Sequence, residues 1–229
     1  MEILRRGGEH LEAREYWRWA ALAALLLVVT LLVAAALSSS RRVGPPVLLV
    51  AIGLLAAVSP ARKILGRIRA ARKGQLGERL VTQLLERLPG DYFLVNDIVL
   101  STGNIDHVLT GPCGVVVIET KRVAGRIHCD GDHWTVNGRR SKSYSKQAKA
   151  GAMAVKGLLA VRHPEFAREF VKAVVVFTEP RCELQISRPA VAVVRFSQLL
   201  AHVVELGQAR RMDRALAHIA ARSLMDGAR

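Results

Sequence analysis

Two apolar runs near the beginning of the chain constrain its fold more than any other feature of the sequence. The first, residues 20–37, is 18 residues long with no charge, which is close to the minimum length for a helix that crosses a bilayer. The second, residues 43–58, is 16 residues long and follows a short polar loop that contains Arg41 and Arg42. Both runs are apolar on every face, which excludes an ordinary amphipathic surface helix. We therefore expect a two-helix transmembrane hairpin over residues 20–58.

Charged residues around the two runs give the expected topology. A cleaved signal peptide fits the first run poorly, because acidic and basic residues are mixed before it where such a peptide has only basic ones. The segment 59–73 contains six Lys and Arg and no acid, whereas the loop between the runs contains two basic residues. This bias places both termini and the globular domain in the cytoplasm. Residues 1–19 are then a cytoplasmic segment before a cell-membrane anchor, and 59–73 are a basic juxtamembrane linker.

Overall charge and cysteine content narrow the function classes. The chain carries 34 Lys and Arg against 19 Asp and Glu, a formal net charge of +15, which fits either a nucleic acid or an anionic lipid surface as a partner. The three cysteines, Cys113, Cys129 and Cys182, are widely spaced and form no CxxC pair. We therefore expect neither a zinc site nor a disulfide framework, and the thiols are expected to be reduced.

From residue 74 onward the pattern becomes that of a mixed α/β domain, which we expect to extend to residue 229. Leucines at helical spacing predict a first helix that ends at Pro89-Gly90. Short Val- and Ile-rich runs between turn residues predict strands at 92–100, 105–110, 114–120, 126–129, 133–136, 171–177 and 190–195. Further helices are expected at 144–161, 197–206 and 212–224.

A hairpin between two of these strands brings charged residues together. If Gly111 to Gly114 close the turn, position 110 lies opposite position 115, and Asp106 lies opposite Glu119. Opposite residues in an antiparallel pair project from the same face, and Lys121, two positions beyond Glu119, projects from that face too. Two carboxylates and one ammonium group are therefore predicted to converge at the end of an apolar strand pair.

This arrangement suits metal-assisted cleavage of a phosphodiester bond. Mg²⁺ is held in proteins by one or two carboxylates with water and phosphate oxygens, and it activates water and neutralises charge on the phosphate. A nearby lysine can position the attacking water or stabilise the transition state. Taken alone, such a triplet is more often an ion pair at the end of a sheet, so the surrounding sequence has to decide.

A series of short motifs surrounds the hairpin, over roughly residues 73–160. In chain order they are Gly77-Glu78, Asn104-Ile105-Asp106-His107, Gly111 to Lys121, Gly125-Arg126-Ile127, Trp134 and Gln147. Their order and spacing resemble the nuclease-related domain (NERD) family, which belongs to the PD-(D/E)XK nuclease superfamily. The resemblance implies a restriction-endonuclease-like mixed sheet flanked by helices, in a domain over 74–229 whose motif-bearing part is 74–160.

The resemblance also implies a set of catalytic residues. Asp106 matches the metal-binding aspartate of the family, and Glu119 and Lys121 match its ExK element. Glu78 matches an acid on the first helix that supplements the metal site, and Gln147 matches a polar residue on a later helix. Asp106, Glu119 and Glu78 are then the expected ligands of Mg²⁺ or Mn²⁺. The alternatives are an acid that favours a helix N-terminus for Glu78, and a solvated helix residue for Gln147.

Basic residues near these motifs are candidate contacts to a nucleic-acid backbone, which Lys and Arg bind without reading the base sequence. The candidates are Arg126, Arg139, Arg140, Lys142, Lys146 and Lys149. A solvated loop and helix face is an equal alternative. The expected function is a membrane-anchored, metal-dependent nuclease acting on DNA, with RNA left open as a substrate. The other functions that fit are a nucleic-acid-binding domain without catalysis and a protein-interaction domain at the membrane, whose partners are unknown.

Overall fold

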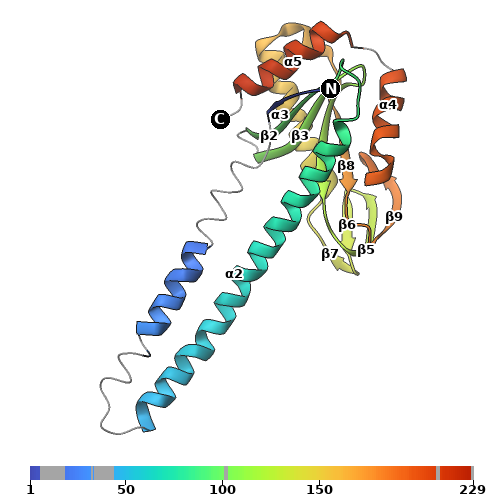
Figure 1. Cartoon of the computed structure of the whole chain (residues 1–229). Helices are drawn as coiled ribbons and strands as arrows, with labels where there is room; N and C mark the ends of the chain where they lie inside the picture. The colour runs from blue at the N-terminus through green and yellow to red at the C-terminus, as the bar shows by residue number, and fades with distance from the viewer. Residues whose placement is uncertain (6–18, 32, 34–43, 101–102, 210–211, 228–229) are drawn as a thin grey trace. The chain divides into compact units, whose positions relative to one another are not determined.

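The computed structural model describes residues 1–5, 19–31, 33, 44–100, 103–209 and 212–227. The chain forms two compact units. One consists of Met1–Gly7 together with Leu76–Arg229, and the other consists of Gly8–Gln75. The strands described below and the candidate site belong to the first unit (Figure 1).

Helices form the described part of the unit Gly8–Gln75. Residues 19–31 are helical, and α2 (Gly44–Leu85) begins in this unit and runs without interruption past its end. The sequence of α2 starts with Gly44-Pro45-Pro46, and proline is tolerated in a first turn because the amide there has no partner within the helix. The segment 59–73, expected as a linker, is therefore part of a helix.

The transmembrane hairpin expected over residues 20–58 is not supported. In the part of the chain that the structure describes, no helix is both long enough and apolar enough to cross a membrane. The described part of the second apolar run, 44–58, is shorter than the ~20 residues that a spanning helix needs. Part of the prediction falls on residues 32 and 34–43, which lie outside the described residues.

A six-stranded mixed sheet forms the centre of the first unit. Its order is β1-β2-β3-β4-β8-β10, in which β2, β3 and β4 are antiparallel neighbours and the other neighbouring pairs are parallel. The strands are rich in Val and Ile, whose branched side chains pack well on a pleated surface. The mixed sheet that the sequence predicts is confirmed. The strand bounds are β1 Glu2–Arg5, β2 Phe93–Leu100, β3 Gly103–Gly111, β4 Gly114–Lys121, β8 Lys172–Phe177 and β10 Ala192–Arg195.

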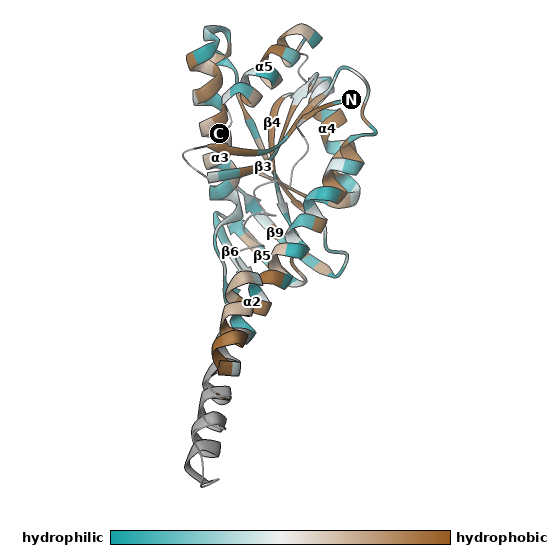
Figure 2. Ribbon diagram, turned by 60° about the vertical axis from the view of Figure 1, so that its left-hand side comes forward, coloured by the Kyte–Doolittle hydropathy of each residue, from teal (hydrophilic) through white to brown (hydrophobic). Residues whose placement is uncertain are grey.

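Helices cover both faces of this sheet, so the sheet is buried between two apolar cores (Figure 1). On one face, α3 (Tyr144–Arg162) and α5 (Arg214–Gly227) pack against β2, β3 and β4. On the other face, the last turns of α2 and the helix α4 (Leu199–Ala209) pack against β4 and β8. Hydrophobic residues accordingly concentrate on the strands between the helices (Figure 2). Two 3-10 helices complete the unit, η1 at Pro164–Arg168 and η2 at Phe196–Gln198.

A second, four-stranded sheet has the order β7-β6-β5-β9. Its core contains Trp134, which is 2% exposed and whose indole Nε1 donates to Ser145 Oγ at 2.8 Å. The indole ring also stacks on Phe177 at the end of β8, with ring centroids 5.9 Å apart, so this sheet is joined to the larger one through aromatic packing. The strand bounds are β5 Gly125–Gly131, β6 His133–Val136, β7 Arg139–Arg140 and β9 Cys182–Pro189.

The sequence does not predict β1 or β9. β1 is four residues long and pairs in parallel with β2, from which it is separated by the whole unit Gly8–Gln75. β9 pairs in parallel with β5 and presents mostly exposed side chains. Parallel pairing joins strands that are distant in the chain, so neither strand has a local turn signal that would reveal it.

Gly77 allows α2 to approach the ends of β4 and β8 closely. A Cβ atom at this position would lie 2.9 Å from Thr178 Oγ1 and 3.2 Å from Thr120 Cγ2. At Gly74, three residues earlier on the same helix, an added Cβ would have no atom within 4 Å. The close approach matters for function because the next residue is Glu78, one of the predicted site residues.

We expect Gly77→Ala to lower the free energy of unfolding by about 1 kcal/mol. Overpacking destabilises a protein by about 1–3 kcal/mol, which exceeds the ~1 kcal/mol of stability that alanine adds over glycine through its higher helix propensity. Gly74→Ala is the matched control and is expected to raise stability by up to ~1 kcal/mol, since only the propensity changes there. Urea unfolding followed by far-UV circular dichroism measures both variants. Equal effects of the two substitutions would contradict the close approach.

Candidate active site

The hairpin of β3 and β4 has the predicted register. Thr110 pairs with Val115, and the ladder continues to His107 opposite Ile118. Beyond this pair the backbone N–H of Thr120 donates to Asp106 Oδ2 at 2.7 Å, so the Asp106 carboxylate lies against the end of β4. Ile105 and Val108 both pack in the core on the α3 face, so β3 does not alternate regularly between them, and the bond from Thr120 holds Asp106 within electrostatic reach of Glu119.

Lys121 joins two of the predicted residues. Its ammonium group donates to Glu119 Oε1 and, at 3.2 Å, to Gln147 Oε1 in the first turn of α3. It also lies 5.3 Å from the centroid of the Tyr144 ring, a cation–π contact that further fixes its position. Ser143 caps α3 by accepting the Lys146 N–H, so the turn that carries Gln147 is well defined. The structure thus brings Asp106, Glu119, Lys121 and Gln147 together.

Glu78 reaches the same group of charges from α2. Burial first, and then the negative charges of Asp106, Asp97 and Glu119, raise its pKa to about 8, although Lys121 lowers it. All five predicted catalytic residues therefore lie in one region, with Glu78 and Gln147 supplied by helices on opposite faces of the sheet.

The carboxylates of this region carry more negative charge than Lys121 neutralises. Burial and the charge of Asp106 raise the pKa of Glu119 to about 7, although Lys121 lowers it. Burial also raises the pKa of Asp106, against the opposing effects of Lys121 and the Thr120 N–H. Burial lowers the pKa of Lys121, but the attraction of Glu119 and Asp106 outweighs it and the net shift is upward, so Lys121 remains a cation.

Asp97 is a further acid that the sequence does not single out. It is 2% exposed, and its φ of 55° is a left-handed conformation that is uncommon inside a strand for any residue other than glycine. Its charge raises the pKa of both Glu78 and Asp106, so it lies within electrostatic reach of the site. Such backbone conformations cluster at functional sites. The available signal in the sequence is an acid inside the apolar strand Phe93–Leu100.

His107 takes no part in this group. It is buried, its Nδ1 lies 2.7 Å from Asn96 Oδ1, and burial lowers its pKa to about 3. The imidazole is therefore neutral and packed within the sheet.

The donor chemistry of the site fits a hard divalent cation. Among the described residues, no three Asp, Glu, His or Cys side chains are grouped closely enough to hold a metal ion. Mg²⁺, however, needs only one or two carboxylates with water and phosphate oxygens. Asp106 and Glu119 provide two carboxylates, and their raised pKa values indicate that a further positive charge would stabilise the ionised forms.

The predicted phosphate-binding residues occupy different environments. Arg126 is exposed and pairs with Glu183 at 3.8 Å, and Lys149 pairs with Asp132 at 2.7 Å. Arg139 and Arg140 are exposed on β7, and Lys146 is exposed on α3. Lys142 lines a cavity that Glu119 and Gln147 also line, so it is the basic residue that the structure places next to the carboxylates.

Comparison with known proteins finds a family match for the segment that contains these residues. Residues 73–178 match the family model described as the nuclease-related domain, NERD. This segment is a nuclease-related domain. The family is placed generally in the PD-(D/E)XK superfamily, and all five predicted catalytic residues fall within the matched segment.

An uncharacterized protein of Bacillus anthracis is 30% identical to the chain over 105 residues, which are 42% of this chain and 50% of that protein. The chain thus spans about half the length of the curated relative it matches. No solved structure gives a significant match.

We expect the metal-free protein to lose stability as the pH rises from about 5 to about 8. The folded-state pKa values of about 8 for Glu78 and about 7 for Glu119 lie above the ordinary 4.5, so the folded state binds these protons more tightly than the unfolded state. Stability falls wherever the folded state binds more protons, and the loss is complete above the higher pKa. Thermal unfolding across this pH range measures it.

Glu78→Gln provides the control for this pH dependence. The amide does not ionise, so the variant is expected to lose less stability than the unsubstituted protein between the same pH values. Mg²⁺ or Mn²⁺ is expected to raise the unfolding midpoint more at pH 8 than at pH 5, because the cation binds the ionised carboxylates. Identical pH profiles for the variant and the unsubstituted protein would show that Glu78 is not in a buried acidic site.

Proposed function

We propose that this protein is a metal-dependent nuclease that hydrolyses phosphodiester bonds in DNA. The observation that carries the proposal is the convergence of Asp106, Glu119 and Lys121 at the end of the β3–β4 hairpin. An ion pair at the end of a sheet would explain Glu119 and Lys121 alone. It does not explain a second buried carboxylate, a third acid on α2, and an upward shift in the pKa of every one of them.

The residues have distinct roles in this proposal. Asp106, held by the Thr120 N–H, and Glu119 would bind Mg²⁺ or Mn²⁺, and Glu78 would add negative charge nearby without acting as a ligand. The bound cation supplies Lewis-acid stabilisation of the phosphate and lowers the pKa of a water molecule. Lys121 is held between Glu119 and Gln147, where a fixed ammonium group can orient the attacking water and stabilise developing negative charge. Gln147 positions Lys121 through its side-chain oxygen.

Substitution of the central residues tests this function in the full-length protein. We expect Asp106→Asn and Lys121→Met each to lower the rate of Mg²⁺-dependent DNA cleavage by about 10²-fold or more, since each removes a group that acts on the transition state. Asp226→Asn and Lys156→Met are matched controls of the same chemistry outside the site. Cleavage is measured on labelled DNA with Mg²⁺, Mn²⁺ or a chelator.

The outcome of these assays separates the proposal from its alternatives. Cleavage that survives both substitutions would show that other residues carry the reaction. DNA binding without cleavage under Mg²⁺ and Mn²⁺ would identify a nucleic-acid-binding domain without catalysis. Neither binding nor cleavage, together with co-purification of a protein partner, would identify an interaction domain.

Attachment to the cell membrane with the nuclease-related domain in the cytoplasm is a separate proposal, which rests on the two apolar runs and the basic residues of the sequence. We expect the full-length chain to sediment with membranes and to resist extraction by high salt. Deletion of residues 20–58 is expected to release it. Release of the intact chain by salt alone would contradict an inserted anchor.

A further inference from the structure

A cavity of about 400 Å³ lies between α3 and the strands β3 and β4, directly beside the candidate active site. Glu119 and Gln147, which both contact Lys121, form part of its wall. The volume is at the lower end of the ~300–1,000 Å³ that is usual for small-molecule sites. The cavity is therefore sized for a small unit of a polymer, not for a second folded partner.

The floor of the cavity is apolar. Ile105 and Val117 project into it from the strands, and Gly151 faces them from α3. A Cβ atom at Gly151 would lie 3.4 Å from Ile105 Cγ1 and 3.4 Å from Val117 Cγ1, so the helix backbone passes close to the floor at this end. An apolar floor of this kind suits the face of a nucleobase or a sugar ring.

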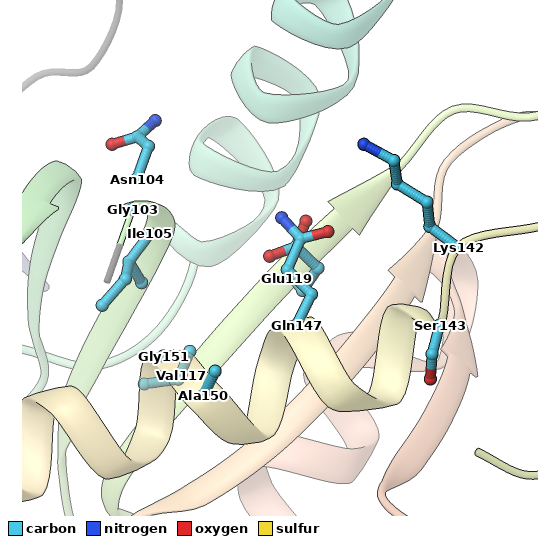
Figure 3. Close-up of a pocket in the computed structure, with 10 residues that line it drawn as sticks. All are labelled: Gly103, Asn104, Ile105, Val117, Glu119, Lys142, Ser143, Gln147, Ala150 and Gly151. Atoms are coloured by element: carbon cyan, nitrogen blue, oxygen red, sulfur yellow. The ribbon is translucent and has the colours of Figure 1, made fainter. Parts of the chain in front are cut away.

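The rim of the cavity is polar and has two different ends. Figure 3 shows Asn104 and Lys142 at opposite ends, with Glu119 and Gln147 between them. The amide of Asn104 can both donate and accept hydrogen bonds, as the edges of nucleobases require. The ammonium group of Lys142 can bind a phosphate that is adjacent along the strand.

We propose that this cavity receives one unpaired nucleotide of the substrate strand, next to the phosphodiester at Asp106, Glu119 and Lys121. The proposal rests on the proposed nuclease function and names its substrate class, a single-stranded or frayed nucleic acid. A base inside a duplex is stacked and paired, so it can enter the cavity only after unpairing, which costs a few kcal/mol and costs least in a single strand. The cavity therefore selects against an intact duplex.

Binding measured without cleavage tests the inference separately from catalysis. Fluorescence anisotropy of the full-length protein, with Ca²⁺ in place of Mg²⁺, gives Kd for a labelled single strand and for its blunt duplex. We expect the single strand to bind about tenfold more tightly than the duplex. Parallel measurements with DNA and RNA strands of one sequence show which sugar the cavity accepts.

Filling the cavity provides the decisive variant. Ala150 lines the cavity from α3, and Ala150→Leu is expected to raise Kd for the single strand about tenfold while leaving Kd for the duplex unchanged. Gly157→Leu adds the same side chain to the same helix at a position with open space, and is expected to change neither value. If circular dichroism shows that Ala150→Leu does not fold, Asn104→Ala at the exposed rim replaces it. This variant is likewise expected to lose the preference for the single strand over the duplex.

Two results would overturn the inference: equal affinity of the unsubstituted protein for single strand and duplex, or an unchanged preference in the cavity variants. Preferential binding of the single strand that is lost in Ala150→Leu supports it, whether or not cleavage is seen. Absence of Mg²⁺-dependent cleavage alongside that result would refute the nuclease function alone.

Discussion

The register of the β3–β4 hairpin is the constraint on which the rest of the site depends. With Thr110 opposite Val115, the ladder runs to His107 opposite Ile118, and the Thr120 N–H beyond it holds the Asp106 carboxylate near Glu119 at the hairpin's open end. A shift of one residue would turn Glu119 toward the opposite core, where His107 and Ile118 are buried. The tight turn between Gly111 and Gly114 prevents this shift, because the length of a hairpin turn fixes the register of its strands. The turn therefore fixes the position of the charged groups.

The helices complete the site from both faces of the sheet, and the acids of the site are incompletely neutralised. α2 contributes Glu78, and α3 contributes Gln147. One cation, Lys121, faces Glu78, Asp106 and Glu119, and all three carboxyl groups have raised pKa values as a result of burial and mutual repulsion. A fold that holds acids in this way loses stability where they ionise, unless a divalent cation binds them. That electrostatic strain is a physical reason to expect metal chemistry here.

The segment that matches the nuclease-related domain includes the candidate site but not the whole first unit. The matched segment ends at residue 178, just after β8, and so contains the hairpin, α3 and the whole candidate site. The strands β9 and β10 and the helices α4 and α5 lie after it, yet they pair with or pack against the matched segment. The first unit of the chain is therefore larger than the family match, and its C-terminal elements support the sheet that carries the site.

The sequence by itself determined the mixed α/β class, the strands that build the hairpin, and its register with Thr110 opposite Val115, because periodicity and turn residues are local signals. It did not determine the pairing of β1 with β2 or of β9 with β5, since parallel partners lie far apart in the chain. The sequence also did not determine the bounds of α2, because hydropathy alone, from which the hairpin over residues 20–58 was expected, does not fix where a helix begins and ends. Only the tertiary structure brought Asp97 within electrostatic reach of Glu78 and formed the cavity between α3 and the strands, because both result from elements packing across a sheet.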